Sequence, residues 1–132
     1  MLLVETYIHK SSIHGLGLFT SQLILKGTKV WEFTPNLDKE YTHEQFLDLP
    51  KRAQEYIFHY GWIDPEINMY RLSFDNDRFM NWNENPNLAG TVNELFALRD
   101  IQKDEELTYP FIEDKSSTKK WQTYNGSILQ FQ

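Results

Sequence analysis

Two glycines spaced one residue apart could bring the backbone close to a ligand. Gly15 and Gly17 lie in the segment HGLGLF at positions 14–19. Glycine lets the backbone adopt a positive φ and lets a ligand approach it closely. A plain hairpin turn would use the same two residues, so the pair alone does not separate a binding turn from a structural one. It is not a dinucleotide-binding fingerprint, because no long strand precedes it and no helix is expected after it.

A second segment could hold the polar part of a ligand. Residues 78–87 contain four Asn and one Pro around three apolar side chains. An Asn side chain offers two donors and an acceptor, but Asn also stabilises the turns of surface loops. The acidic segment 100–109 indicates by itself only a solvated turn that enters a strand. Four carboxylates that could serve a hydrolase lie in turns, and nothing in the sequence pairs them: Asp75, Asp77, Glu84 and Glu105.

Short strands and one helical stretch must position these segments. β-Branched and aromatic residues predict strands at 3–8, 18–20, 30–34, 92–98 and 106–109, with two more around a turn at 64–65. The capping-box pattern of residues 42–45 predicts a helix over 42–47. Pro50 opens a second helix that ends at Gly61. Many short strands with one helical insert predict a β-rich α+β domain.

The composition narrows the classes of function. The 132 residues fit one domain, and 40% hydrophobic residues suffice for a core. The absence of Cys excludes thiolate zinc sites and cysteine nucleophiles. Without a signal peptide or a membrane-spanning apolar run, we expect a soluble, cytoplasmic protein with no membrane partner. The formal charge of −6 argues against direct nucleic-acid binding, and it suits either a lysine-rich partner or simple solubility.

Taken in order, the three segments resemble the SET domain family. The family's opening turn matches residues 14–19 and the following KGTKV at 26–30, and its middle motif, RFxNHSxxPN, matches residues 78–87. Its closing motif, which ends in ELTyDY, matches residues 101–111. The resemblance covers residues 12–113. A helical insert at about 38–64 looks like that of compact bacterial-type SET proteins. The chain ends in a tail at about 114–132. We therefore interpret residues 1–132 as a single SET domain.

The resemblance implies a fold, an activity and a set of site residues. The fold would be a β-clip of small curled sheets in which the C-terminal strand threads under the middle-motif loop as a pseudoknot. The activity would be transfer of a methyl group from S-adenosyl-L-methionine to a lysine of a protein or peptide, without a metal. The catalytic positions would be Tyr109, Phe111 and Phe33. The cofactor-binding positions would be His14, Gly15, Leu16, Gly17, Arg78, Asn81, Trp82, Tyr109 and Trp121.

Three positions depart from the family pattern. Trp82 replaces the His of the middle motif, Phe111 replaces the final Tyr of the closing motif, and Phe33 stands where a second lining Tyr is expected. Both Phe residues keep the ring and lose the hydroxyl that would orient the lysine amine. Each unpaired buried polar group costs about 1–3 kcal/mol, so we predict a slow methyltransferase.

Two alternatives follow from these departures. Another tyrosine, such as Tyr60, Tyr70 or Tyr109, could supply a substitute hydroxyl. Otherwise the chain is a catalytically impaired SET module that binds the cofactor or a lysine-containing partner.

Overall fold

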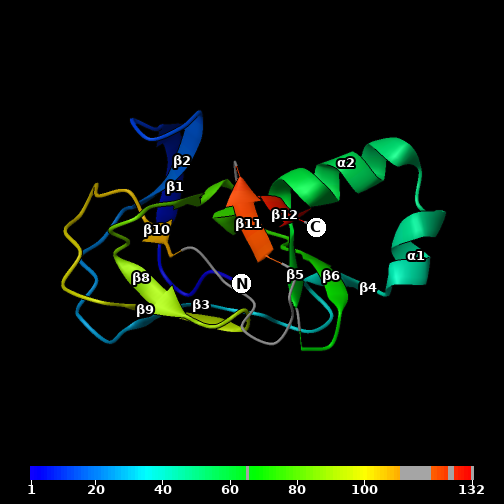
Figure 1. Ribbon diagram of the computed structural model, residues 1–132. Helices are drawn as coiled ribbons and strands as arrows, with labels where there is room; N and C mark the ends of the chain where they lie inside the picture. Colours follow the sequence, from blue (N-terminus) through cyan, green and yellow to red (C-terminus); the bar gives the residue numbers. More distant parts are fainter. Residues whose placement is uncertain (65, 111–119, 125–126, 132) are drawn as a thin grey trace.

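The computed structural model describes residues 1–64, 66–110, 120–124 and 127–131, the last two ranges as backbone strands (Figure 1). The described elements are mostly short strands, as the sequence predicts. In chain order they are β1 (Thr6–Lys10), β2 (Leu16–Thr20), β3 (Lys29–Glu32), β4 (Lys39–Tyr41), α1 (His43–Asp48), α2 (Lys51–Tyr60), β5 (Trp62–Asp64), β6 (Met69–Leu72), the 3-10 helix η1 (Asn76–Phe79), β7 (Asn81–Trp82), β8 (Leu88–Gly90), β9 (Glu94–Ala97), β10 (Thr108–Tyr109), β11 (Lys120–Tyr124) and β12 (Ser127–Phe131).

The strands form small separate sheets rather than one large sheet. β1 pairs with β2, β9 lies between β3 and β8, β6 lies between β4 and β5, and β11 pairs with β12, all antiparallel. The exception is β10, which runs parallel to β7. Parallel neighbours need a crossover, and here the crossover contains β8 and β9. The short parallel pair therefore joins the middle of the chain to its later part.

The helical insert begins where its capping pattern predicts. Thr42 is the N-cap of α1, its hydroxyl accepts from the Gln45 backbone N–H, and the Gln45 side chain accepts from the Thr42 N–H. Pro50 directly precedes α2, and the fixed φ of proline suits the start of a helix. Figure 1 shows both helices on the same side of the molecule as β4, β5 and β6. The insert at 38–64 therefore also contains strands, which flank its helices and pair with β6.

Two hydrophobic clusters divide the described chain. The first lies among β2, β3, β8, β9 and β10, and its buried members are Leu18, Ile24, Val30, Met80, Leu88, Ala97, Ile101 and Leu107. The second lies under the helices, and its buried members are Phe46, Ile57, Ile63 and Tyr70. Tyr109 packs against the first cluster and Trp62 against the second.

A bulge in β3 lets one strand serve both clusters. Lys29 pairs with Phe96 and Trp31 pairs with Leu95, so Val30 is the extra residue. Val30 is buried in the first cluster, and Trp31 is buried with its ring against Trp62 at 5.3 Å. A bulge re-aims the side chains around it, so Trp31 turns away from the cluster that holds its neighbour.

Several boundaries differ from the sequence prediction. The sequence predicts this strand from residue 18, but β2 already begins at Leu16, which pairs with Lys10. The Asn-rich segment contains β7, and the tail contains the β11–β12 hairpin, which the polar sequence did not indicate. The described helices are all too short and too polar to cross a membrane.

A buried arginine ties the helical insert to the rest of the domain. Arg71 on β6 has a side chain 6% exposed. Its guanidinium lies 3.0 Å from the Asp64 carboxylate, 3.2 Å from Glu40 and 2.7 Å from the Asn93 side-chain oxygen, and it stacks 4.0 Å from the Phe33 ring. Asp64 is itself buried, so removing Arg71 would leave an unpaired carboxylate in the interior.

We predict that Arg71→Met lowers the free energy of unfolding by about 3–5 kcal/mol, the usual cost of breaking a buried ion pair from one side. Urea denaturation measures this change. The matched control is Arg52→Met, since Arg52 is 95% exposed and pairs with Glu55 on the surface of α2; it should change stability by about 0.5 kcal/mol or less. Equal effects of the two changes would contradict the proposed role of Arg71.

Candidate active site

The two positions of the opening turn require glycine for different physical reasons. Gly15 has a φ of +47°, in the left-handed region that favours glycine. Gly17 has no such constraint, but a Cβ at this position would collide with the Glu106 carboxylate and press on the Ser11 side chain. The first glycine shapes the turn, and the second lets the turn lie against Glu106.

Asn81 holds the backbone of this turn. Its side-chain nitrogen lies 3.1 Å from the carbonyl oxygens of both His14 and Leu16, and 2.9 Å from Glu106 Oε1. Ser11 Oγ contacts the same carboxylate at 2.8 and 2.9 Å. Because these protein acceptors engage the Asn81 nitrogen, its donors position the turn rather than reach outward.

A second asparagine fastens β10 beside β7. The Asn87 side chain donates to the Glu106 carbonyl at 2.8 Å and accepts from the Thr108 N–H at 2.9 Å. The Asn83 N–H donates to the Tyr109 carbonyl at 3.1 Å. These bonds fix Tyr109 next to the middle motif. Threading of the chain beyond this point, as a pseudoknot requires, falls on residues outside the described ranges and stays a prediction.

One pocket opens at the glycine turn, and we call it the glycine-turn pocket. The turn, the end of α2 and the segment from η1 to β7 contribute its lining, which is His14, Gly15, Leu16, His59, Tyr60, Arg78, Phe79, Met80 and Asn81. Two imidazoles and a guanidinium therefore share it with apolar side chains.

Arg78 contributes less to this pocket than its charge suggests. Its guanidinium donates to the Ser73 carbonyl at 2.7 Å, the Asp75 carbonyl at 3.2 Å and the Tyr56 hydroxyl at 2.6 Å. These bonds hold η1 against α2. Like Asn81, Arg78 stabilises the wall of the pocket.

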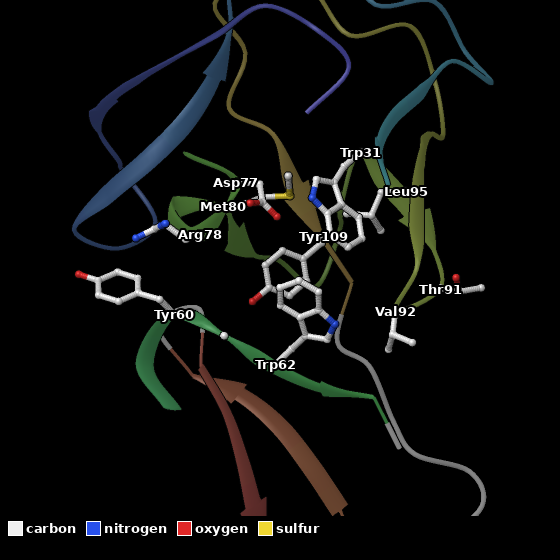
Figure 2. A pocket seen from close by; sticks show the side chains of 11 residues that line it. Trp31, Tyr60, Trp62, Asp77, Arg78, Met80, Thr91, Val92, Leu95 and Tyr109 are labelled. Atoms are coloured by element: carbon white, nitrogen blue, oxygen red, sulfur yellow. The ribbon is translucent and has the colours of Figure 1, made fainter. Parts of the chain in front are cut away.

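A second pocket, the aromatic pocket, lies between the two hydrophobic clusters (Figure 2). It is lined by Trp31, Tyr60, Gly61, Trp62, Asp77, Arg78, Met80, Thr91, Val92, Leu95 and Tyr109. Tyr60, Arg78 and Met80 line both pockets, so these three side chains form a shared wall between them.

The aromatic pocket contains one carboxyl group in an apolar setting. Asp77 lies on η1, and Ser73 Oγ donates to its Oδ2 at 2.8 Å, while its Oδ1 is buried. Burial raises the pKa of Asp77 well above its ordinary value, and a side-chain hydrogen bond with Asp75 and the charge of Asp75 add to the shift. The indoles of Trp31 and Trp62 meet edge to face at an interplanar angle of 79°.

The structure brings together most, but not all, of the predicted site residues. His14, Gly15, Leu16, Arg78 and Asn81 line the glycine-turn pocket, where Gly17 supports the turn, and Tyr109 lines the aromatic pocket. Trp82 lies in β7 directly opposite Tyr109. Phe33 is not among the residues that line either pocket, because its ring stacks on Arg71. Phe111 and the Trp121 side chain lie outside the described residues, so their roles stay predictions.

Sequence reasoning missed several residues that line the pockets. The sequence marks Tyr60 only as a substitute hydroxyl, and it gives no signal for a role of Trp31, Trp62 or His59 in a site. Trp31 is two residues from the expected Phe33, and the β3 bulge that aims it leaves no mark in the sequence. Asp77 carries a signal, since it is a carboxylate directly before the middle motif, but only the fold shows its burial. Among the described residues, no cluster of His, Asp or Glu is suited to hold a metal.

Comparison with known proteins defines the class. The family model of the SET domain matches residues 15–111, and the chain therefore belongs to the SET domain family. A Plasmodium falciparum protein named "Putative histone-lysine N-methyltransferase 1" is 32% identical over 127 residues, which is 82% of this chain but only 2% of that protein. The chain thus spans a small fraction of this curated relative.

Solved structures share the fold at lower identity. A crystal structure of a Plasmodium falciparum "putative histone methyltransferase" matches 88% of this chain and 100% of its own with a TM-score of 0.62 and 21% identity. The Neurospora histone lysine methyltransferase DIM-5 matches 90% of this chain and 56% of its own with a TM-score of 0.58 and 19% identity. A chain of the ctPRC2 complex with H3K27me3 and H3K27M matches 87% of this chain and 15% of its own, with a TM-score of 0.63 and 17% identity. The organisms named for these relatives are eukaryotic. They do not support the expectation that the chain is a SET protein of the bacterial type.

We predict that Asp77→Asn stabilises the protein at neutral pH. The pKa of Asp77 is higher in the folded state than its unfolded value near 3.8. The wild type therefore loses stability as the pH rises from the unfolded pKa to the folded pKa. Asn is isosteric and carries no charge, so the variant avoids this loss.

Thermal unfolding between about pH 4 and pH 8 tests this, because the gain in Tm of Asp77→Asn over wild type should grow with pH. Glu66→Gln makes the same change of charge at an exposed position and should show no such trend. A variant less stable than wild type at neutral pH would overturn the argument.

Proposed function

We propose that the chain is an S-adenosylmethionine-dependent protein-lysine N-methyltransferase. The observation that carries the proposal is the pair of pockets that meet at the shared wall of Tyr60, Arg78 and Met80. A methyl transfer between two separately bound molecules needs such an arrangement, because donor and acceptor must enter from different sides and meet at one point. Membership of the SET family and the similarity to a protein named as a histone-lysine methyltransferase support the same conclusion.

The glycine-turn pocket fits the chemistry of the cofactor. Gly15 leaves the space around its Cα open, so a ligand can approach the backbone. His14 and His59 could receive a carboxylate, while Leu16 and Met80 offer apolar contact for the sulfur-bearing chain. When bound, S-adenosylmethionine supplies an activated methyl group. The residues of this pocket then have only to bind and orient it.

The aromatic pocket suits an aliphatic chain that ends in an amine. Its lining is largely aromatic and aliphatic, so it would exclude water from a lysine side chain. Tyr109 stands beside the middle motif and limits the direction of approach. The acidic chain, with a formal charge of −6, also favours encounter with a basic partner.

Incubation with radiolabelled S-adenosylmethionine and a mixed protein extract tests the activity. We expect label on lysine residues of extract proteins, and no label when the cofactor is replaced by its demethylated product. Wild type that binds the cofactor but transfers no label would point to the impaired SET module.

We predict that Gly17→Ala weakens binding of S-adenosylhomocysteine by about tenfold or more, equivalent to about 1.4 kcal/mol. The added Cβ would collide with Glu106 and displace the turn that Asn81 holds. Isothermal titration calorimetry measures the affinity. Gly27→Ala is the matched control, because Gly27 has a φ of +84° in a turn that lines neither pocket, so it should reduce stability and leave affinity unchanged.

We predict that Phe111→Tyr speeds methyl transfer by about one to two decades. The family resemblance gives this position a hydroxyl that pairs with the lysine amine, and one such bond in a dry channel is worth about 1–3 kcal/mol. Single-turnover assays with a lysine peptide compare the variant with wild type. The double change with Pro110→Asp controls for a shift of the ring by Pro110, and an unchanged rate in both variants would remove Phe111 from the active centre.

A further inference from the structure

Three aromatic rings gather in the aromatic pocket, and we call them the aromatic corner. They belong to Trp31, Trp62 and Tyr109, which all line this pocket (Figure 2). The ring centres of Trp31 and Trp62 lie 5.3 Å apart, and their planes meet at 79°. Two ring planes near a right angle form a corner, and the electron-rich faces of aromatic rings attract a cation.

We propose that the aromatic corner binds the methylated ammonium head of a lysine side chain in preference to the unmodified one. This inference rests on the proposed function, because it takes the aromatic pocket as the lysine site, and it deepens that function by naming the methylation state of the ligand. An unmodified ammonium carries three N–H donors. A trimethylated ammonium carries none and keeps the positive charge. The acceptors that the pocket offers therefore decide which state binds better.

The carboxyl group of the pocket does not provide a counter-ion. Ser73 Oγ donates to Asp77 Oδ2 at 2.8 Å, and Asp77 also shares a side-chain hydrogen bond with Asp75. Burial holds the pKa of Asp77 well above its ordinary value, so the folded protein disfavours its charged form. A neutral carboxyl group that is bonded to protein partners does not pair with an ammonium group.

The other polar side chains near the aromatic corner also offer few acceptors. The indole N–H groups of Trp31 and Trp62 can only donate. The Thr91 hydroxyl already accepts from the Asn93 N–H at 3.1 Å. One hydroxyl oxygen, that of Tyr109, cannot serve three N–H donors. An unmodified ammonium would therefore lose hydrogen bonds to water that these side chains do not replace.

The one cation of the pocket lining does not change this preference. Figure 2 shows the Arg78 guanidinium and the Tyr60 hydroxyl pointing away from the aromatic corner. Arg78 donates to protein acceptors at Ser73, Asp75 and Tyr56. Methylation leaves the charge of the lysine head unchanged, so any repulsion by Arg78 is the same for every methylation state.

Each added methyl group makes the lysine head a better fit. It removes an N–H group that would be buried without a partner, which is costly. It also adds apolar surface that packs against the rings. A lysine that has gained one methyl group should therefore bind better than before, so the same lysine is retained for a further transfer.

Nuclear magnetic resonance titration at pH 7 tests the proposal with three probes. They are N-acetyl-lysine methylamide, its ε-trimethylated form, and the neutral isostere of that form in which carbon replaces the ammonium nitrogen. Trp31→Phe and Trp62→Phe assign the indole N–H signals. We expect both signals to move with the trimethylated probe. Its affinity should be about tenfold higher than that of unmodified lysine and about fivefold higher than that of the neutral isostere.

Variants of the aromatic corner locate the preference. Trp62→Leu and Tyr109→Leu each remove one ring, and circular dichroism shows which of them folds. Each folded variant should reduce the preference for the trimethylated probe to about threefold or less. Phe74→Leu is the matched control, since Phe74 is 47% exposed and lines neither pocket, and it should keep the full preference.

Equal affinity of wild type for the lysine and trimethyl-lysine probes would overturn the proposal. So would tighter binding of the neutral isostere, no movement of either indole signal, or the full preference in a folded variant of the aromatic corner. The probes require neither cofactor nor methyl transfer. A wild type that prefers trimethyl-lysine but transfers no label would refute only the proposed function, and one that transfers label without this preference would refute only this inference.

Discussion

One amide nitrogen, that of Asn81, joins parts of the chain that are far apart in sequence. It bonds two carbonyl oxygens of the glycine turn and the carboxylate of Glu106, and Ser11 closes the group from the other side. The two pockets depend on this contact, because it fixes the turn against the segment that carries Arg78 and Met80. Gly17 belongs to the same constraint, since any side chain there would enter the space that Glu106 occupies.

The aromatic pocket owes its position to the division of the core. Trp62 packs on the cluster under the helices, Tyr109 packs on the cluster among the strands, and Trp31 bridges them through its contact with Trp62. Arg71 supports this division from outside the pocket, because it ties β6 to Asp64, Glu40 and Asn93. The lining of the aromatic pocket therefore comes from residues of both hydrophobic clusters and not from a single loop.

Local patterns in the sequence predicted much of the fold and the frame of the site. The capping box at Thr42, the helix after Pro50 and the β-rich character are confirmed, because they depend on residues close in sequence. The family motifs marked Asn81 and Tyr109, and the structure places each at the wall of a pocket, while their roles toward a ligand stay predictions. The family pattern marked Phe33, but its ring stacks on Arg71, and Trp31 lines the pocket instead. Nor could the pattern show that the donors of Arg78 and Asn81 are engaged by the protein, which only tertiary contacts decide.

The contact between Ser11 and Glu106 spans 95 positions of the chain. Contacts of such separation form slowly, because a long loop must close before they contribute. During synthesis the glycine turn emerges from the ribosome early and then waits for its partner, exposed, until the second half of the domain has been made. The helical insert, whose helices pack on strands close to them in sequence, can begin to fold in that interval. The order of translation thus places the assembly of both pockets last.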